Sequence, residues 1–334
     1  MTVPSKIRID GAVVFSIKCC LVAACLVLAS CSSPVAQKPV ATGVSQAAAG
    51  KLKVVVVTHG STGDAFWNVV ENGALQAGRD LDVSVTYYSD GDPAAQARLI
   101  DNAVAQKAGG LVVSMANPQA LQTSVQNAVK AGIPVVTINS GEDSSAAFGA
   151  IAHVGQSEGL AGQGAGRRLK EAGKSHLLCV IHEAGNIGQT QRCDGAKQTF
   201  GRTTTLQVDI ANPTDIQARI RAQLQSDPSI DAVLALNSQI ASRAYSAAKD
   251  AGSKAEVATF DLNNEVASGI KSGDILFAVD QQQYEQGYLP IVLLKLYTEN
   301  GNTLGGGRPV QTGPGFVDKS NVDAITPYIQ RGTR

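Results

Sequence analysis

This sequence has no excess of positive or negative charge. Its 334 residues contain 28 Lys and Arg against 28 Asp and Glu, and no block of basic residues stands out. A protein that holds DNA or RNA gains much of its affinity by neutralising phosphates with basic side chains. The composition therefore excludes nucleic acid as an expected partner.

Histidines are few, and none of them is grouped as a metal site requires. The four are His59, His153, His176 and His182. His182-Glu183 lacks the second histidine of a zinc-protease helix, and His59 suits a core or loop role better than that of a general base. The glycine-rich segment 159–166 lacks the spacing of a dinucleotide loop and continues as a helix over 167–171, which favours close helix packing. We therefore expect no enzyme, no cofactor and no metal.

An apolar run of membrane-spanning length is also absent. The N-terminal run from Cys19 to Ser30 has twelve residues, whereas a spanning helix needs roughly 18 to 20. Lys6, Arg8 and Lys18 precede the run, which is typical of a secretory signal peptide rather than of an anchor. Removal of residues 1–30 from the exported protein leaves 25 basic against 27 acidic residues.

The run closes with Leu28-Ala29-Ser30-Cys31, which resembles the lipobox of bacterial lipoproteins. That resemblance implies lipidation of Cys31 and attachment to the outer face of the cell membrane. Val22-Ala23-Ala24-Cys25 is the alternative, but it leaves almost no apolar run after Lys18. Residues 31–51 are then the lipidated cysteine and a tether rich in Ser, Pro, Ala, Gln and Gly, without apolar periodicity.

Cysteine is scarce in the rest of the chain, where only Cys179 and Cys193 follow Cys31. An even pair in an oxidising compartment is more often a disulfide than two thiols. Cys179 lies in a strand-like run and Cys193 near the start of the following helix. We interpret the pair as a disulfide, with two free thiols as the alternative, because the sequence does not give their separation.

Short β-branched runs alternate with amphipathic stretches from residue 53 onward. The first series covers 54–58, 66–79, 83–88, 93–107, 111–115, 118–131 and 135–138, and the second covers 177–181, 192–200, 206–208, 215–224, 232–236, 240–251, 257–260, 264–271 and 275–279. Asp92-Pro93 and Asn117-Pro118 each place an N-cap acceptor before a proline at the first helical position. The run 54–57 is apolar on both faces, as in parallel strands covered by helices on both sides. These patterns predict two doubly wound α/β lobes.

Polar or aromatic residues follow the predicted strands, at the edge where open α/β sheets bind ligands. The candidate ligand-binding residues are Asp64, Phe66, Trp67, Asn139, Ser140, Arg192, Asn237, Asp261 and Gln281. Their groups suit a neutral polyhydroxy ligand, whose hydroxyls take hydrogen bonds while its C–H faces lie on rings.

Several of these candidates have a plainer structural alternative. Asp64 and Asp261 could each be only a helix N-cap, and Arg192 a solvated cation at a helix start. One of the two adjacent aromatic residues could belong to the core. Asn139 and Ser140 are turn residues by type.

The mature part resembles the periplasmic sugar-binding proteins of the ribose-binding type, the soluble receptors of ABC importers, from about Lys53 to Asp323. The resemblance rests on an ordered set of motifs: Asp64-Ala65-Phe66-Trp67, Ala131-Gly132-Ile133-Pro134-Val135-Val136-Thr137-Ile138, Arg192-Cys193-Asp194-Gly195, Ala235-Leu236-Asn237, Thr259-Phe260-Asp261 and Phe277-Ala278-Val279-Asp280-Gln281. It implies a type I periplasmic binding protein, with two parallel-sheet lobes joined by a hinge. The expected N-terminal lobe is 52–153 plus 283–311, and the C-terminal lobe is 154–282 plus 312–330, because a helix over 284–297 and a strand-like tail over 316–318 follow the second series.

The resemblance also implies roles for individual residues. Asp64 and Gln281 would bind hydroxyls, and Phe66 and Trp67 would line the ring faces. The second lobe would add Arg192, Asn237 and Asp261 on hinge closure, with Arg192 and Asp261 near one another across the ligand.

Two departures from the ribose-binding pattern change the expected ligand. Asn139-Ser140 stands where ribose binders carry an Asp-Arg pair. The aromatic residue that the pattern expects in the second lobe is missing, and its position falls near Thr214. We therefore expect a polyol, a cyclitol, a tetrose or another pentose, captured by a monomer and delivered to an ABC permease. A sensory receptor shares every one of these features, whereas a lactose-repressor-type regulator would need a helix-turn-helix that 32–51 cannot form.

Overall fold

The computed structural model describes residues 50–61 and 63–334. The predicted signal peptide, the predicted lipidation site at Cys31 and most of the predicted tether lie outside these described residues. Among the described residues, no helix combines the length and the apolar character that crossing a membrane requires.

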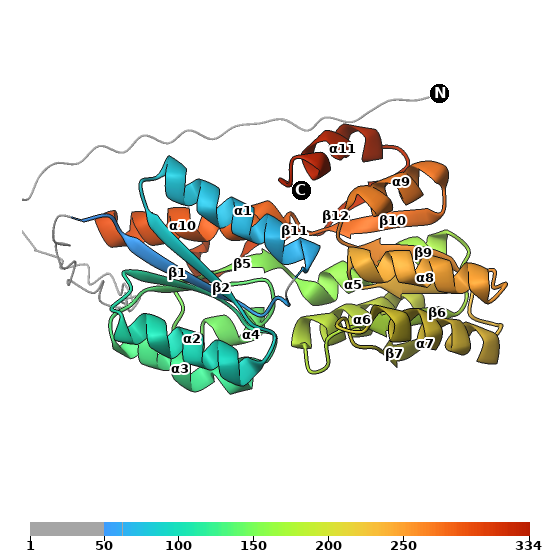
Figure 1. Cartoon of the computed structure of the whole chain (residues 1–334), viewed down its shortest axis with the longest axis horizontal. Coiled ribbons are helices and arrows are strands. Elements are labelled where there is room, and N and C mark those ends of the chain that lie inside the picture. The colour runs from blue at the N-terminus through green and yellow to red at the C-terminus, as the bar shows by residue number, and fades with distance from the viewer. Residues whose placement is uncertain (1–49, 62) are drawn as a thin grey trace, which may run out of the picture. The chain divides into compact units, whose positions relative to one another are not determined.

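Two six-stranded sheets form the framework (Figure 1). The first contains β1 (Lys53–Thr58), β2 (Ser84–Ser89), β3 (Gly110–Ser114), β4 (Val135–Ile138), β5 (Ala152–Gln156) and β11 (Val310–Gly313), in the order β11-β5-β4-β3-β1-β2. The second contains β6 (Leu177–Ile181), β7 (Thr203–Gln207), β8 (Ala232–Ala235), β9 (Glu256–Phe260), β10 (Ile275–Asp280) and β12 (Gly315–Asp318), in the order β12-β10-β9-β8-β6-β7. All neighbours are parallel except β12, which is antiparallel to β10. The predicted pair of doubly wound α/β lobes is confirmed.

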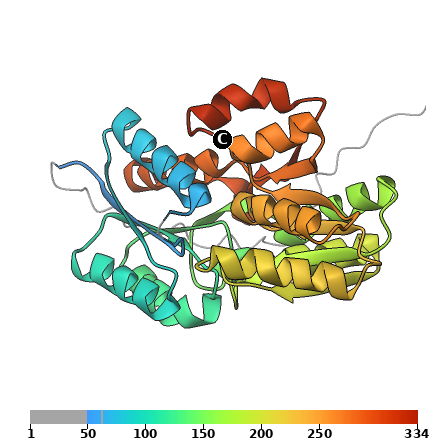
Figure 2. The same ribbon diagram turned by 45° about the vertical axis from the view of Figure 1, so that its right-hand side comes forward.

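Helices cover both faces of each sheet (Figures 1 and 2). They are α1 (Ala65–Asp80), α2 (Pro93–Ala105), α3 (Pro118–Lys130), α4 (Glu142–Ser145), α5 (Glu158–Glu171), α6 (Ile187–Phe200), α7 (Pro213–Ser226), α8 (Ser238–Asp250), α9 (Asn264–Ser272), α10 (Gln283–Asn300) and α11 (Val322–Gln330), with a 3₁₀ turn at Gly305–Gly307. In β1, Val54 and Val56 pack with α1 and α10, whereas Val55 and Val57 pack with α2 and α3. Successive residues of a strand point to opposite faces, so the continuous apolar run serves two cores.

The second sheet repeats this layering. Alternate residues of β6 divide between α5 and α6 on one face and α7, α8, α9 and α11 on the other. The predicted helix caps at Asp92 and Asn117 are confirmed, because their side chains accept hydrogen bonds from Ala95 N at 2.7 Å and Ala120 N at 3.2 Å. The two lobes are thus built by the same local rules.

Several elements were not foreseen in full from the apolar pattern, among them α4 and β11. Strand β5 carries His153, Gly155 and Gln156 and has no continuous apolar run. Helix α6 begins at Ile187, five residues before the predicted start, because its first turn is polar. The C-terminal helix α11 was not predicted either.

Close packing of α5 on α6 explains the glycine-rich segment 159–166, as expected. A side chain at Gly162 would overlap the carbonyl oxygen of Arg192, and one at Gly195 would overlap the carbonyl oxygen of Gly159. The two backbones therefore approach without intervening side chains. This approach brings the first residue of α5, Glu158, beside Arg192.

The chain passes between the sheets at three places, after Gln156, between β10 and α10, and between β11 and β12. Hydrogen bonds join the last two crossings, since Gln282 Nε2 donates to Thr312 O at 2.6 Å and Thr312 Oγ1 donates to Gln281 O at 2.7 Å. The lobe boundaries given above, and a hinge at these segments, remain predictions.

Candidate functional site

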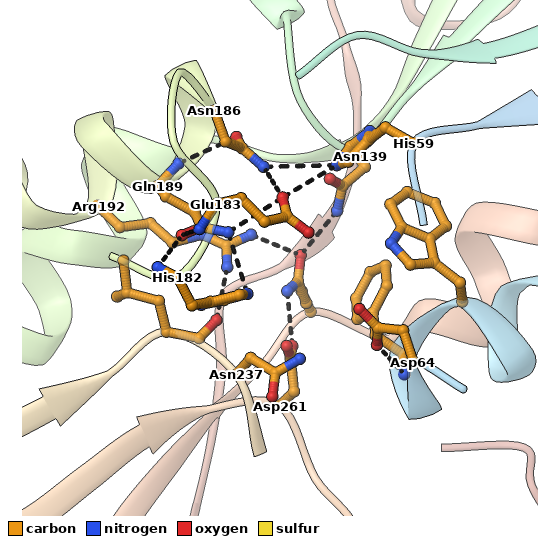
Figure 3. Close-up of a pocket in the computed structure, with 14 residues that line it drawn as sticks. His59, Asp64, Asn139, His182, Glu183, Asn186, Gln189, Arg192, Asn237 and Asp261 are labelled. Atoms are coloured by element: carbon orange, nitrogen blue, oxygen red, sulfur yellow. Dashed lines mark hydrogen bonds and ion pairs between the residues drawn. The ribbon is translucent and has the colours of Figure 1, made fainter. Parts of the chain in front are cut away.

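A cavity of about 300 Å³ lies at the carboxyl ends of the strands of both sheets (Figure 3). Its lining consists of His59, Asp64, Phe66, Trp67, Asn139, His182, Glu183, Asn186, Gln189, Arg192, Leu236, Asn237, Asp261 and Gln281. Eight of the nine candidate residues from the sequence are among them. Ser140 is not, because its hydroxyl is directed to Asn139 Oδ1 at 3.1 Å and Asn186 Oδ1 at 3.3 Å.

The first turn of α1 supplies an aromatic side to the cavity. The rings of Phe66 and Trp67 meet edge to face with centroids 4.9 Å apart, and the His59 ring lies 4.7 Å from Trp67. Both aromatic side chains are buried, and they also contribute to the core of the first lobe. Asp64 caps α1 by accepting from Phe66 N at 2.9 Å, so this carboxylate both starts the helix and lines the cavity.

Arg192 is buried and paired rather than solvated. Its Nε and Nη2 donate to the two carboxylate oxygens of Glu158 at 2.6 and 2.8 Å, and its Nη1 donates to Leu236 O at 3.2 Å. Burial alone would lower the pKa of Arg192, but Glu158, together with the charges of Asp261 and Glu183, outweighs it and raises that pKa. The sequence reasoning missed Glu158, which no motif marked and which only the α5–α6 packing brings to this position.

Gln281 is the central link between the two sides of the cavity. Its Oε1 accepts from Arg192 Nη2 at 3.2 Å and from Asn139 Nδ2 at 3.3 Å, while its Nε2 donates to Asp261 Oδ1 at 2.6 Å. Arg192 and Asp261 are therefore connected through Gln281. Among the described residues, no direct hydrogen bond joins those two charges.

Asp261 is free to face the cavity because Asn263 caps the next helix. Asn263 Oδ1 accepts from Val266 N at 2.7 Å, so the alternative in which Asp261 caps α9 is wrong. Asn237 caps α8 through its Oδ1, which accepts from Gln239 N at 2.6 Å. The cap uses the Asn237 oxygen, which leaves its amide nitrogen as the group available to a ligand.

Two buried histidines occupy equivalent positions after β1 and β6. His59 Nε2 lies 3.4 Å from Asn186 Nδ2, and His182 Nε2 lies 3.0 Å from Gln189 Nε2. Burial, and next the charge of Arg192, lower the pKa of each histidine to about 3. Both rings are therefore neutral, and each accepts an amide hydrogen at Nε2.

Three further residues that the sequence reasoning missed, Glu183, Asn186 and Gln189, lie around the start of α6. Asn186 caps this helix by accepting from Gly188 N at 2.9 Å, and Gln189 Oε1 accepts from His182 N at 2.9 Å. An asparagine directly before a polar helical turn is an N-cap signal that could have revealed this start. With it, Glu183, Asn186 and Gln189 would have been placed after β6.

The cavity contains more acceptors than its single cation can pair. Burial, followed by the charge of Glu183, raises the pKa of Asp64 to about 7. Burial also raises the pKa of Asp261 to about 7 against the opposing effect of Arg192, and it raises the pKa of Glu183. Within 50–61 and 63–334, no three His, Cys, Asp or Glu side chains cluster so as to hold a metal ion. The arrangement suits a neutral ligand that donates hydroxyl hydrogens, and it disfavours an anion.

A disulfide holds α6 against its own strand. Cys179 in β6 and Cys193 in α6 are bonded, with Cα atoms 5.8 Å apart. Cys193 directly follows Arg192, so the bridge fixes the segment that carries the guanidinium.

Comparisons with known proteins agree with this architecture. The family model described as "Periplasmic binding protein domain" matches residues 54–302. The xylose/arabinose-binding protein XylF of Sulfolobus acidocaldarius is 25% identical over 297 residues, 83% of this chain and 73% of the relative. The ribose import binding protein RbsB of Bacillus subtilis is 25% identical over 233 residues, 66% of this chain and 70% of the relative. These relatives are solute-binding proteins.

Solved structures give the same picture. A carbohydrate transporter from Acidothermus cellulolyticus 11B, in complex with myo-inositol, is 44% identical with a TM-score of 0.84, covering 85% of this chain and 100% of that one. A periplasmic solute-binding protein of an ABC transporter from Actinobacillus succinogenes 130z, with bound D-allose, is 20% identical with a TM-score of 0.73, covering 82% and 100%. The second likeness concerns the fold alone.

Proposed function

This chain belongs to the periplasmic binding protein family, and from that premise we propose that it captures a neutral cyclitol, polyol or sugar outside the cytoplasm for an ABC permease. Like its relatives, it is a solute-binding protein and not an enzyme. The observation that carries the ligand class is the lining of the cavity, where the rings of Phe66 and Trp67 lie with the carboxyl groups of Asp64, Glu183 and Asp261.

The lining of the cavity favours a ring that carries hydroxyls. Phe66 and Trp67 offer ring faces for C–H groups, and Asp64, Glu183 and Asp261 offer acceptors for hydroxyls. A ring with a hydroxyl on most carbons matches that distribution.

A cyclitol is the first ligand to test within this class. The relative at 44% identity was solved with myo-inositol. The acidic balance of the cavity, with the Arg192 charge already matched by Glu158, argues against phosphorylated forms.

Capture would proceed by closure of the two lobes. The ligand would dock against the rings of the first lobe, and the second lobe would then bring Arg192, Asn237 and Asp261 to it, with bending at the three crossings. No bond is made or broken. Lipidation of Cys31 would hold the protein at the outer face of the membrane, near its permease.

Isothermal titration calorimetry and thermal shift of the purified protein test the proposal. The panel is myo-inositol, scyllo-inositol, xylitol, D-xylose, L-arabinose and D-ribose, with myo-inositol 1-phosphate as the anionic comparison. We expect at least one neutral compound to bind and raise the melting temperature, and the phosphate to bind more weakly than myo-inositol. Absence of binding by every neutral compound, or a preference for the phosphate, would contradict it.

A further inference from the structure

A second, larger cavity of about 920 Å³ adjoins the first on the side of the loops that follow β1, β6 and β7. The two cavities share four lining residues, His59, His182, Glu183 and Asn186. We call these four residues the shared wall. They lie between a smaller inner cavity and a larger outer one.

Hydrogen bonds hold the shared wall together (Figure 3). Asn186 Nδ2 donates to Glu183 Oε2 at 2.5 Å and to His59 Nε2 at 3.4 Å. Glu183 Oε2 also accepts from Gln189 Nε2 at 3.2 Å and lies 3.8 Å from His59 Nε2. His59 is fixed from behind, because its Nδ1 lies 2.7 Å from Ser114 Oγ. Asn186 is therefore the donor that links Glu183 to His59.

The shared wall includes groups from both lobes. His59 follows β1 of the first sheet, whereas Asn186 precedes α6 beside the second sheet. Two further bonds cross at the same place, from Ser140 Oγ to Asn186 Oδ1 at 3.3 Å and from Ile187 N to Ala116 O at 3.0 Å. The wall thus closes only when the lobes approach each other.

We propose that Glu183 and Asn186 determine specificity by admitting an unsubstituted ring to the inner cavity and rejecting a ring that carries a group on the oxygen facing them. This inference rests on the proposed function. A substituent there would have to displace the Asn186–Glu183 contact and leave buried donors and acceptors without partners, which lowers affinity by roughly tenfold to hundredfold. The larger cavity is the space that the substituent would enter once the wall is removed.

The decisive variant is Asn186→Ser. Serine keeps an N-cap acceptor for α6 but removes the amide that bonds Glu183 and His59. Asn212→Ser is the matched control, because Asn212 caps α7 in the same way at an exposed position. The probes are myo-inositol, its monomethyl ethers and its galactosyl ether, and D-xylose with its methyl glycosides, measured by calorimetry.

We expect the wild-type protein to bind the unsubstituted ring at least about tenfold more tightly than any ether whose group faces the wall. In Asn186→Ser, the affinity for at least one ether should rise about tenfold relative to the affinity for its unsubstituted parent. Asn212→Ser should keep the wild-type ratio of these two affinities. Wild-type affinity for the galactosyl ether within about threefold of myo-inositol would overturn the proposal. A ratio of ether affinity to parent affinity that is unchanged in both Asn186→Ser and Glu183→Ala would also overturn the proposal.

A measurement without ligand separates this inference from the proposed function. Trp67 is the only tryptophan and lines the inner cavity. Acrylamide should quench its fluorescence more strongly in Asn186→Ser and Glu183→Ala than in the wild type or Asn212→Ser. Equal quenching in all four proteins contradicts the wall, whereas failure of every neutral compound to bind the wild type contradicts the proposed function.

Discussion

The two lobes have the same strand order but present different chemistry to the cavity. The first lobe supplies the rings of Phe66 and Trp67, whereas the second supplies Arg192, Glu183 and Asp261. An aromatic surface recognises the flat faces of a ring, and charged groups recognise its hydroxyls. The rings of Phe66 and Trp67 thus come from the first lobe, whereas both lobes place hydrogen-bonding groups at the cavity, with Asp64 and Asn139 in the first.

Residues that follow corresponding strands of the two sheets share their backbone geometry. Asn139 follows β4 and Asp261 follows β9, and both adopt left-handed backbone with φ of 60° and 66°. His59 and His182 follow β1 and β6 in the same relation. The fold therefore repeats the backbone geometry, and the choice of side chain at each position sets the chemistry.

The edge strands differ for a topological reason. Strand β11 runs parallel to β5 and ends at the cavity side of the first sheet, and only Pro314 separates it from β12. Strand β12 must then start at the cavity side of the second sheet, so it runs antiparallel to β10. One short crossing thus determines the single antiparallel pair.

Removal of the buried cation in the second lobe should have the largest effect. Arg192→Ala leaves Glu158 as an unpaired buried charge, and we expect a loss of about 3–5 kcal/mol in the free energy of unfolding. Urea denaturation measures it. Arg219→Ala, which removes an exposed partner of Asp215, should cost less than about 0.5 kcal/mol. A loss below about 1 kcal/mol for Arg192→Ala would mean that the pair is not buried in solution.

Loss of one acceptor charge should come next. Asp261→Asn keeps the shape of the side chain but removes its charge, and we expect affinity for the bound neutral compound to fall by about tenfold to hundredfold. Calorimetry measures the change, with the exposed Asp101→Asn as the control. Unchanged affinity would remove Asp261 from the site.

Loss of a ring face in the first lobe should have a smaller effect. Trp67→Leu retains apolar bulk but removes the indole face, which is expected to weaken binding by about twofold to tenfold. In the wild-type protein, the bound compound should change the Trp67 emission, because this tryptophan lines the cavity. A compound that saturates the site by calorimetry without altering that emission would argue against contact with Trp67.

Change of pH should act through Asp64 and Asp261 with opposite signs on stability and on binding. The pKa values of Asp64 and Asp261 are raised to about 7 in the folded protein from 3.8, so the folded state holds more protons between pH 4 and 7. The contribution of these two carboxyl groups to stability without ligand should therefore fall as pH rises through that range. The buried His59, His153 and His182, whose pKa values are lowered to about 3, 4 and 3, contribute in the opposite direction below about pH 6.5. Affinity should rise over the same range, because the ionised carboxylates are the better acceptors.

Melting temperature and calorimetric affinity, measured at pH 5.5 and 7.5, test this prediction. The stability of the double variant Asp64→Asn, Asp261→Asn, relative to the wild type, should rise from pH 5.5 to pH 7.5, and its affinity should depend less on pH than that of the wild type. A stability difference between the two proteins that stays constant with pH would contradict the prediction.

The sequence by itself determined the alternation of strands and helices, the caps at Asp92 and Asn117, and eight residues of the cavity. These features depend on local periodicity and on the rule that parallel strands end at one edge. Only the tertiary structure decided that Glu158 neutralises Arg192, that Ser140 turns to Asn186, and that Asn186 and Glu183 form a wall. The first two contacts join elements far apart in the chain, and the third meets His59 of the other lobe. Their geometry therefore depends on how closely two helices or two lobes pack, which no local pattern encodes.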